Sequence, residues 1–185
     1  MQSWIRQPYT LRRLTRLGSI FTKADLEVLS LVNTPLMSRA FHSQSPLKEL
    51  DEDGRSLLHV CARLGLLEAC TSILALEPSS VYVQSGSGFT PVHEAVLSAD
   101  HATLEKLCEV HASRECVGAF DLAVSQYLRG NLSESCVSLL ASHNLWSDTS
   151  LMAVMAYCHA VNDWALFSLF PLKRNLTLYM GEEHM

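Results

Sequence analysis

The chain has 185 residues, of which 48% are hydrophobic and 18% are charged, and its formal net charge is −5. This length fits one domain or one short stack of repeats with tails, and the apolar share excludes a mainly disordered chain. The most apolar helix candidate, residues 151–170, is interrupted by Asn162 and Asp163, so we expect no membrane span.

Residues 1–24 form a basic amphipathic head. They carry five arginines and lysines and no acidic residue, whereas the rest of the chain has a net charge of −10. An Arg-rich, acid-free amphipathic N-terminus resembles a mitochondrial targeting segment, which predicts a mitochondrial location. In a helical projection with about 100° per residue, the basic side chains lie opposite an apolar face formed by Trp4, Leu11, Leu14, Leu17 and Phe21.

Two other interpretations of the head stay open. One is an amphipathic helix that packs on the rest of a cytoplasmic protein or on a partner. The other is a retained basic arm that contacts acidic lipid or RNA phosphate.

Residues 25–50 are predicted to form an N-terminal helical hairpin and a loop. Asp25 lies in the first turn of the first helix, where an acidic side chain is favourable. The run Asn33-Thr34-Pro35 ends that helix, a second short helix covers residues 36–41, and a loop follows at 43–46.

Two similar segments stand in the middle of the chain. Arg55 to Cys61 (RSLLHVC) is matched further along by Phe89 to Ala95 (FTPVHEA). A glycine precedes both copies at the same spacing, at Gly54 and Gly88. A period of about 33 residues is typical of a stacked-repeat protein, in which each unit buries its apolar face against its neighbours.

These copies resemble the ankyrin repeat, whose pattern places Gly-x-Thr-Pro-Leu-His-x-Ala at the start of the first helix. The resemblance implies an all-α fold, namely a helical-hairpin repeat solenoid of about three to four repeats with degenerate ends. This repeat domain would cover residues 51–170, followed by a tail at 171–185. The resemblance also implies structural roles for Gly54, His59, Gly65, Gly88, Thr90, Pro91 and His93, with Ala99 in the position of Gly65.

The spacing of apolar residues places the helices of each unit. We expect helices at 56–63 and 66–76 in the first unit and at 90–98 and 102–110 in the second, with a flexible crossing at 79–88. A degenerate third copy of the motif begins at Gly118 and carries Asp121 where the motif has histidine. Its second helix is expected at 132–141. A fourth hairpin covers 150–159 and 164–170.

The sequence contains no recognisable catalytic or metal-binding pattern. The six cysteines include no Cys-x-x-Cys pair and most fall on apolar helix faces, which indicates a reducing compartment. His93-Glu94 opens like the zinc-protease helix motif, but Leu97 stands where the second histidine is required. We therefore predict a protein that is not an enzyme and has no metal, no cofactor and no small-molecule substrate.

In ankyrin-like stacks, partners dock on the hairpin tips and on the first helices. The last hairpin of this chain is apolar on more than one face, and a terminal repeat needs a polar outer face to stay soluble. We therefore expect the head or another chain to cover this end. The candidate protein-binding residues are Asp51, Glu52, Asp53, Arg55, Ser87, Phe89 and Glu94 at the tips and first helices, and Trp164, Phe167 and Phe170 at the last hairpin.

These features predict a non-catalytic interaction or structural subunit of a larger assembly, whose partners are other protein subunits. If the head targets mitochondria, the candidate assemblies are a respiratory complex, ATP synthase and the mitochondrial ribosome. The first alternative is a soluble cytosolic or nuclear adaptor that binds a partner peptide. The second follows from the later units, which resemble tetratricopeptide and pentatricopeptide hairpins, because hairpins of the latter family bind RNA.

Overall fold

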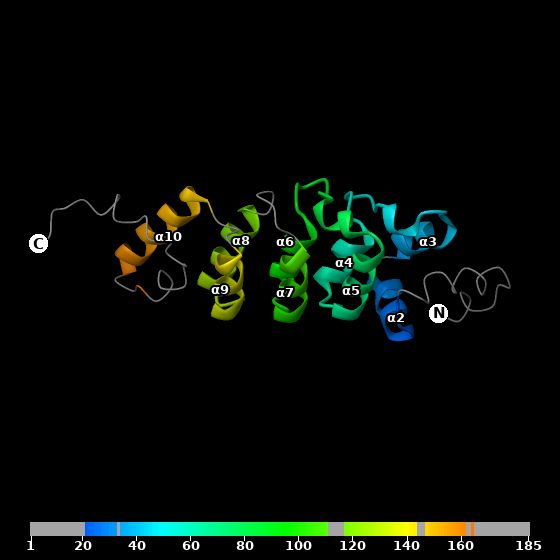
Figure 1. Ribbon diagram of the computed structural model, residues 1–185, viewed down its shortest axis with the longest axis horizontal. Coiled ribbons are helices and arrows are strands. Elements are labelled where there is room, and N and C mark those ends of the chain that lie inside the picture. The colour runs from blue at the N-terminus through cyan, green and yellow to red at the C-terminus, as the bar shows by residue number, and fades with distance from the viewer. Residues whose placement is uncertain (1–20, 33, 111–116, 144–146, 162–163, 165–185) are drawn as a thin grey trace, which may run out of the picture.

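The computed structural model describes residues 21–32, 34–110, 117–143, 147–161 and 164, which fold into a row of helices (Figure 1). These residues contain no strand and a single isolated antiparallel bridge, between Leu50 and Ser56. The predicted all-α class is therefore confirmed for the described part of the chain. The helices are α2 (Lys23–Val32), α3 (Thr34–His42), η1 (Pro46–Lys48), α4 (Leu57–Arg63), α5 (Leu67–Leu76), η2 (Pro78–Tyr82), α6 (Pro91–Ser98), α7 (His101–Val110), α8 (Val117–Leu128), α9 (Glu134–Ser142) and α10 (Asp148–Val161).

Helices α2 and α3 form the predicted N-terminal pair. Thr22 and Asp25 cap α2 reciprocally: the Asp25 N–H donates to Thr22 Oγ1 at 3.1 Å, and the Thr22 N–H donates to Asp25 Oδ2 at 2.9 Å. Helix α2 ends at Val32 and α3 begins at Thr34, with Pro35 in its first turn. Both predicted helices are present, but Thr34 and Pro35, which were predicted to end the first, belong to the second.

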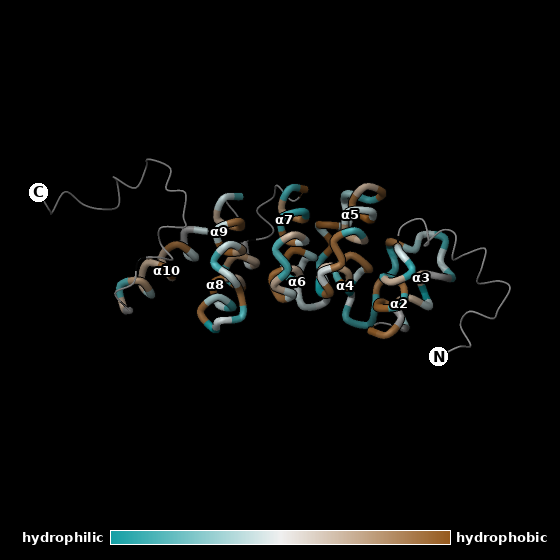
Figure 2. The backbone as a smooth tube through the Cα atoms, turned by 90° about the horizontal axis from the view of Figure 1, so that it is seen from below, coloured by the Kyte–Doolittle hydropathy of each residue, from teal (hydrophilic) through white to brown (hydrophobic). Residues whose placement is uncertain are grey.

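The following helices lie in two layers. Helices α4, α6 and α8 pack side by side in one layer, and α5, α7 and α9 do so in the other (Figure 2). The two helices of each pair also contact one another, and the core lies between the layers. Fully buried alanines allow the helices to approach closely, and they include Ala62, Ala69, Ala95, Ala119, Ala123 and Ala141.

The predicted flexible crossing at 79–88 is wrong. Pro78 begins the short helix η2, in which Val81 is fully buried and Ser80 nearly so. The backbone N–H of Ser85 then donates to Phe89 O at 2.8 Å and closes a turn. The buried side chain of Val81 holds this segment against the core. The Ser-Gly-Ser-Gly stretch alone predicts flexibility and gives no sign of this contact.

The later helices keep the predicted order with shifted bounds. Helix α9 begins two residues after the predicted start, because Ser133 takes the N-cap position. Helix α10 extends beyond 150–159 at both ends. Of the predicted arm 164–170, only Trp164 is described, and the head up to residue 20 also lies outside the described residues. None of the described helices is long and apolar enough to cross a membrane.

Left-handed backbone follows the first helix of each of the first two units. Gly65 has a φ of +66° after α4, and Ala99 has a φ of +57° after α6. The matched positions of Gly65 and Ala99 in the sequence therefore share one backbone conformation. Glycine adopts it without strain, whereas a residue with a Cβ loses about 1–2 kcal/mol there.

We expect Ala99→Gly to raise the free energy of unfolding by about 0.5–1 kcal/mol, because relief of this strain exceeds the added entropy of glycine in the unfolded chain. The opposite change, Gly65→Ala, is the matched control. Its new Cβ would lie 3.2 Å from Asp100 Cβ, and it should cost about 1–2 kcal/mol. Urea denaturation of both variants measures the two effects. A loss of stability in Ala99→Gly would contradict this account.

Candidate functional site

The first hairpin tip, residues 51–55, is built around the carboxylate of Asp51. Its Oδ1 accepts hydrogen bonds from the backbone N–H of Asp53 at 3.0 Å and of Arg55 at 2.8 Å, and its Oδ2 accepts one from Arg55 Nε at 2.9 Å. Gly54, with a φ of +73°, completes the turn. The Asp51 side chain is only 6% exposed, so it shapes the tip and presents little charge to a partner.

The second tip, residues 85–89, is attached to the first. The backbone N–H of Gly86 donates to Asp53 O at 2.7 Å. A Cβ on Gly54 would lie 3.0 Å from Gly86 N, so the glycine permits this close approach. Residues 51–55 and 85–89 thus form one continuous surface, which we call the tip surface.

His59 fixes the base of the tip surface. Its Nδ1 accepts a hydrogen bond from the Ser56 N–H at 3.1 Å at the start of α4, and its Nε2 contacts Phe89 O at 2.9 Å. Because a carbonyl oxygen can only accept, the proton lies on Nε2. The ring is fully buried, and burial lowers the pKa of His59. A neutral imidazole therefore joins α4 to the second tip.

His93 repeats this cap in the second unit. Its Nδ1 accepts from the Thr90 N–H at 3.2 Å, and Pro91 occupies the first position of α6. The ring stacks on Phe89, with centroids 5.0 Å apart and planes inclined by 10°. Both motif histidines therefore cap helices, and both also lie against Phe89 of the second tip.

The tip surface is acidic. The side chains of Glu52 and Asp53 are 86% and 71% exposed. Arg55 is partly exposed, and its Nη2 pairs with Asp53 Oδ2 at 2.8 Å. Ser87 is exposed and Phe89 is half-buried. Among the carboxylates of this surface, Glu52 is therefore the most exposed, and its Oε1 lies 3.9 Å from Arg39 Nη2 of α3.

The expectation that Glu94 faces a partner is wrong. This residue of α6 is only 7% exposed, and its Oε2 lies 3.8 Å from Arg63 Nη1 of α4. Burial raises the pKa of Glu94, and the charges of Arg63 and Arg55 oppose that rise only in part. The carboxylate thus lies between two packed helices and is not part of the exposed tip surface.

We expect Glu94→Gln to raise the urea midpoint at pH 7. The folded pKa of Glu94 is above its ordinary value of 4.5, so ionisation costs stability as the pH rises through the folded pKa. Glutamine keeps the shape and does not ionise. The gain should therefore shrink as the pH falls toward 4.5, whereas a gain that is independent of pH would contradict the assignment.

The described residues offer no arrangement for metal or thiol chemistry. They contain no group of three or more His, Cys, Asp or Glu side chains placed to hold a metal ion. Burial raises the pKa of Cys70 to about 12 and also raises the pKa of Cys61, so both thiols stay protonated near neutral pH. The cysteines of the described residues are all buried and free, namely Cys61, Cys70, Cys108, Cys136 and Cys158.

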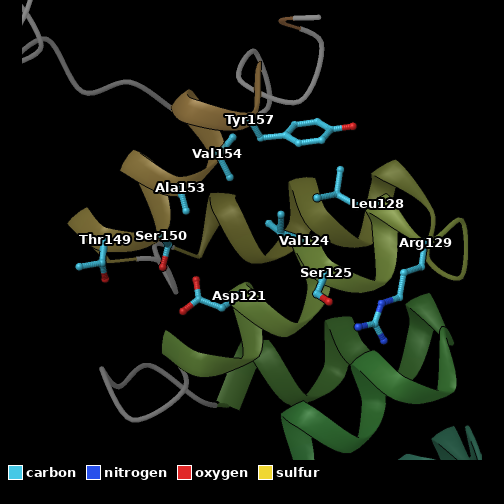
Figure 3. Close-up of a pocket in the computed structure, with 10 residues that line it drawn as sticks. All are labelled: Asp121, Val124, Ser125, Leu128, Arg129, Thr149, Ser150, Ala153, Val154 and Tyr157. Carbon is cyan, nitrogen blue, oxygen red and sulfur yellow. The ribbon is translucent and has the colours of Figure 1, made fainter. Parts of the chain in front are cut away.

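A groove between α8 and α10, which sequence reasoning missed, has a volume of about 450 Å³ (Figure 3). It arises because α10 contacts α8 less extensively than α6 does. Asp121 lies at one end and Arg129 at the other, with apolar side chains between them. We call it the α8–α10 groove, and its lining consists of Asp121, Val124, Ser125, Leu128, Arg129, Thr149, Ser150, Ala153, Val154 and Tyr157.

The far end of the row exposes apolar side chains. Met152 is 62% exposed, Trp164 is 46% exposed and Tyr157 is 38% exposed. The candidate residues Phe167 and Phe170 lie outside the described residues. The apolar excess that the sequence indicates is thus present at the surface of α10.

No family model, curated protein or solved structure matches this chain at a significant level. The tip surface and the α8–α10 groove are therefore interpreted from their own chemistry.

Proposed function

We propose that the chain is an ankyrin-like helical-repeat protein that works as a non-catalytic interaction or structural subunit of a larger assembly. The observation that carries this proposal is the tip surface. Its two tips are joined by the hydrogen bond from Gly86 to Asp53 and by the ring of His59. A surface held in this way loses little conformational entropy when a partner binds.

The repeated local chemistry supports the ankyrin-like assignment. Ser56 with His59, and Thr90 with His93, make the same cap at matching positions of the two units. Stacked repeats require the same caps and turns in each unit, because each unit packs only on its neighbours. The third pair, α8 and α9, continues both layers although its motif is worn.

The charge of the tip surface favours a basic protein partner. Its exposed carboxylates at Glu52 and Asp53 repel phosphate, which disfavours RNA as the ligand of this surface. The mitochondrial location rests on the basic head, and the candidate assemblies are the respiratory complexes, ATP synthase and the mitochondrial ribosome.

The test is a charge reversal on the tip surface. Glu52→Lys should lower the assembled fraction of the protein about tenfold, because a reversed charge in an interface costs about 1–2 kcal/mol. Glu105→Lys is the matched control, since Glu105 is exposed on α7 away from the tips. Gradient sedimentation of both variants from cells measures the fraction. Equal assembly of both variants would exclude the tip surface as the interface.

A further inference from the structure

The charges at the two ends of the α8–α10 groove are complementary to charges in the C-terminal tail of the same chain. Asp121 and Arg129 lie at opposite ends of the groove (Figure 3) and are eight residues apart in the sequence, with Arg129 directly after the last residue of α8. Neither of them makes an ion pair with any other described residue. In the tail, Arg174 precedes Glu182 by the same eight residues.

The tail sequence has the pattern of a short helix. Pro171 suits the first helical position and Gly181 suits the position after the last turn. Leu172, Leu176 and Tyr179 recur at helical spacing and form one apolar stripe. From Asp121 to the end of α8 at Leu128 the helix rises about 10 Å, and from Arg174 to the residue before Gly181 a tail helix rises about 9 Å.

We propose that residues 171–183 dock in the α8–α10 groove, with residues 171–180 as a helix parallel to α8. Lys173 and Arg174 then lie near Asp121, and the acidic pair Glu182-Glu183 lies near Arg129. The apolar stripe of the tail covers the apolar middle of the groove. This inference goes beyond the proposed function and holds whether or not the tip surface binds a partner.

The groove supplies charges that stabilise the tail helix, which is only marginally stable when the tail is free. A helix of this length is marginal in water, and basic residues in its first turn with acidic residues after its last oppose the helix macrodipole. Asp121 near the N-terminus of the docked helix and Arg129 near its C-terminus reverse this disadvantage. Docking and helix formation are therefore coupled.

The chain between α10 and the tail helix is long enough for the tail to reach the groove. Helix α10 ends at Val161, and the connection runs from there to Pro171. When extended, this connection spans up to about 35 Å, whereas α10 itself is about 21 Å long. The tail can therefore run back along α10 to the end of the groove marked by Asp121.

The test is cross-linking of the full chain in dilute solution. Cysteines are introduced by Ser125→Cys in the groove and Leu176→Cys in the tail, in a Cys116→Ser background. The other native thiols are buried, so a short bis-maleimide reagent should join the two new ones within one chain. The matched control replaces Ser125→Cys by Glu68→Cys, which lies exposed on α5 in the other layer.

The expected product is an internally linked monomer whose yield exceeds that of the Glu68→Cys control. Lys173→Glu with Arg174→Glu should lower the yield about two- to fivefold, since exposed ion pairs contribute about 0.5–1 kcal/mol. Adding Asp121→Lys should restore it. A cross-linked dimer would assign the groove to the tail of a second copy, and a yield equal to the control would exclude docking; either result overturns the proposal.

Discussion

His59→Ala should lower the free energy of unfolding by about 2–4 kcal/mol. The buried ring accepts from the Ser56 N–H and donates to Phe89 O, so alanine removes a helix cap and leaves both backbone groups without this partner. The same change loosens the attachment of the second tip to the first unit. Urea denaturation followed by circular dichroism measures the loss.

Two further variants separate the contributions of the ring. Glutamine suits this position of a capping box, so His59→Gln should keep much of the cap, lose the bond to Phe89 and cost about half as much. His101→Ala removes an exposed histidine of α7 and should change stability by less than about 0.5 kcal/mol. Equal effects of His59→Ala and His101→Ala would show that the buried ring contributes nothing.

The loss from His59→Ala should also depend on pH. Burial holds the folded pKa of His59 below its ordinary value of 6.5, so the unfolded chain takes up the proton first as the pH falls. The contribution of the neutral ring is therefore complete above pH 6.5 and declines as the pH falls from there toward the folded pKa. The difference between wild type and His59→Ala should narrow below pH 6.5, and a difference that widens there would contradict a neutral buried ring.

Phe120→Ala should lower the free energy of unfolding by about 3–5 kcal/mol. Phe120 has the largest side chain among the fully buried residues of the described structure, and it lies in α8, which packs on α6. Alanine leaves a cavity that the neighbouring helices fill only in part. Because the helix pairs contact mainly their neighbours, we expect α8 and α9 to unfold at lower urea concentration than α4 to α7.

Leu76→Ala is the control for this prediction, because Leu76 is the last residue of α5 and is 61% exposed. It should cost about 1 kcal/mol or less. Hydrogen exchange by mass spectrometry resolves which helices lose protection. Loss of protection in all helices together in Phe120→Ala would contradict a stack that unfolds in parts.

Local chemistry explains which parts of the fold could be predicted. The caps at Ser56 and Thr90 and the left-handed turns at Gly65 and Ala99 depend on residues close in sequence. Such signals repeat whenever the unit repeats, so their spacing locates the helices. The Asp51 turn is equally local. The sequence pattern did not indicate, however, that the Asp51 carboxylate would be buried and hydrogen-bonded within the tip.

Features that depend on distant packing could not be predicted. Glu94 occupies the position of Val60 in the preceding unit, and its burial depends on α4, which also supplies Arg63. The α8–α10 groove depends on how far α10 lies from α8, which no local pattern encodes. Asp121 and Arg129 can be recognised as the two ends of one groove only when α10 is placed beside α8.

The native size of the endogenous protein tests the central claim most directly. Mitochondrial and cytosolic fractions are separated and each is sedimented through a gradient without denaturation. We predict recovery in the mitochondrial fraction at many times the mass of one chain, which is 20.6 kDa. Recovery in the cytosol as a monomer of 20.6 kDa would contradict the assembly-subunit proposal and favour a free adaptor.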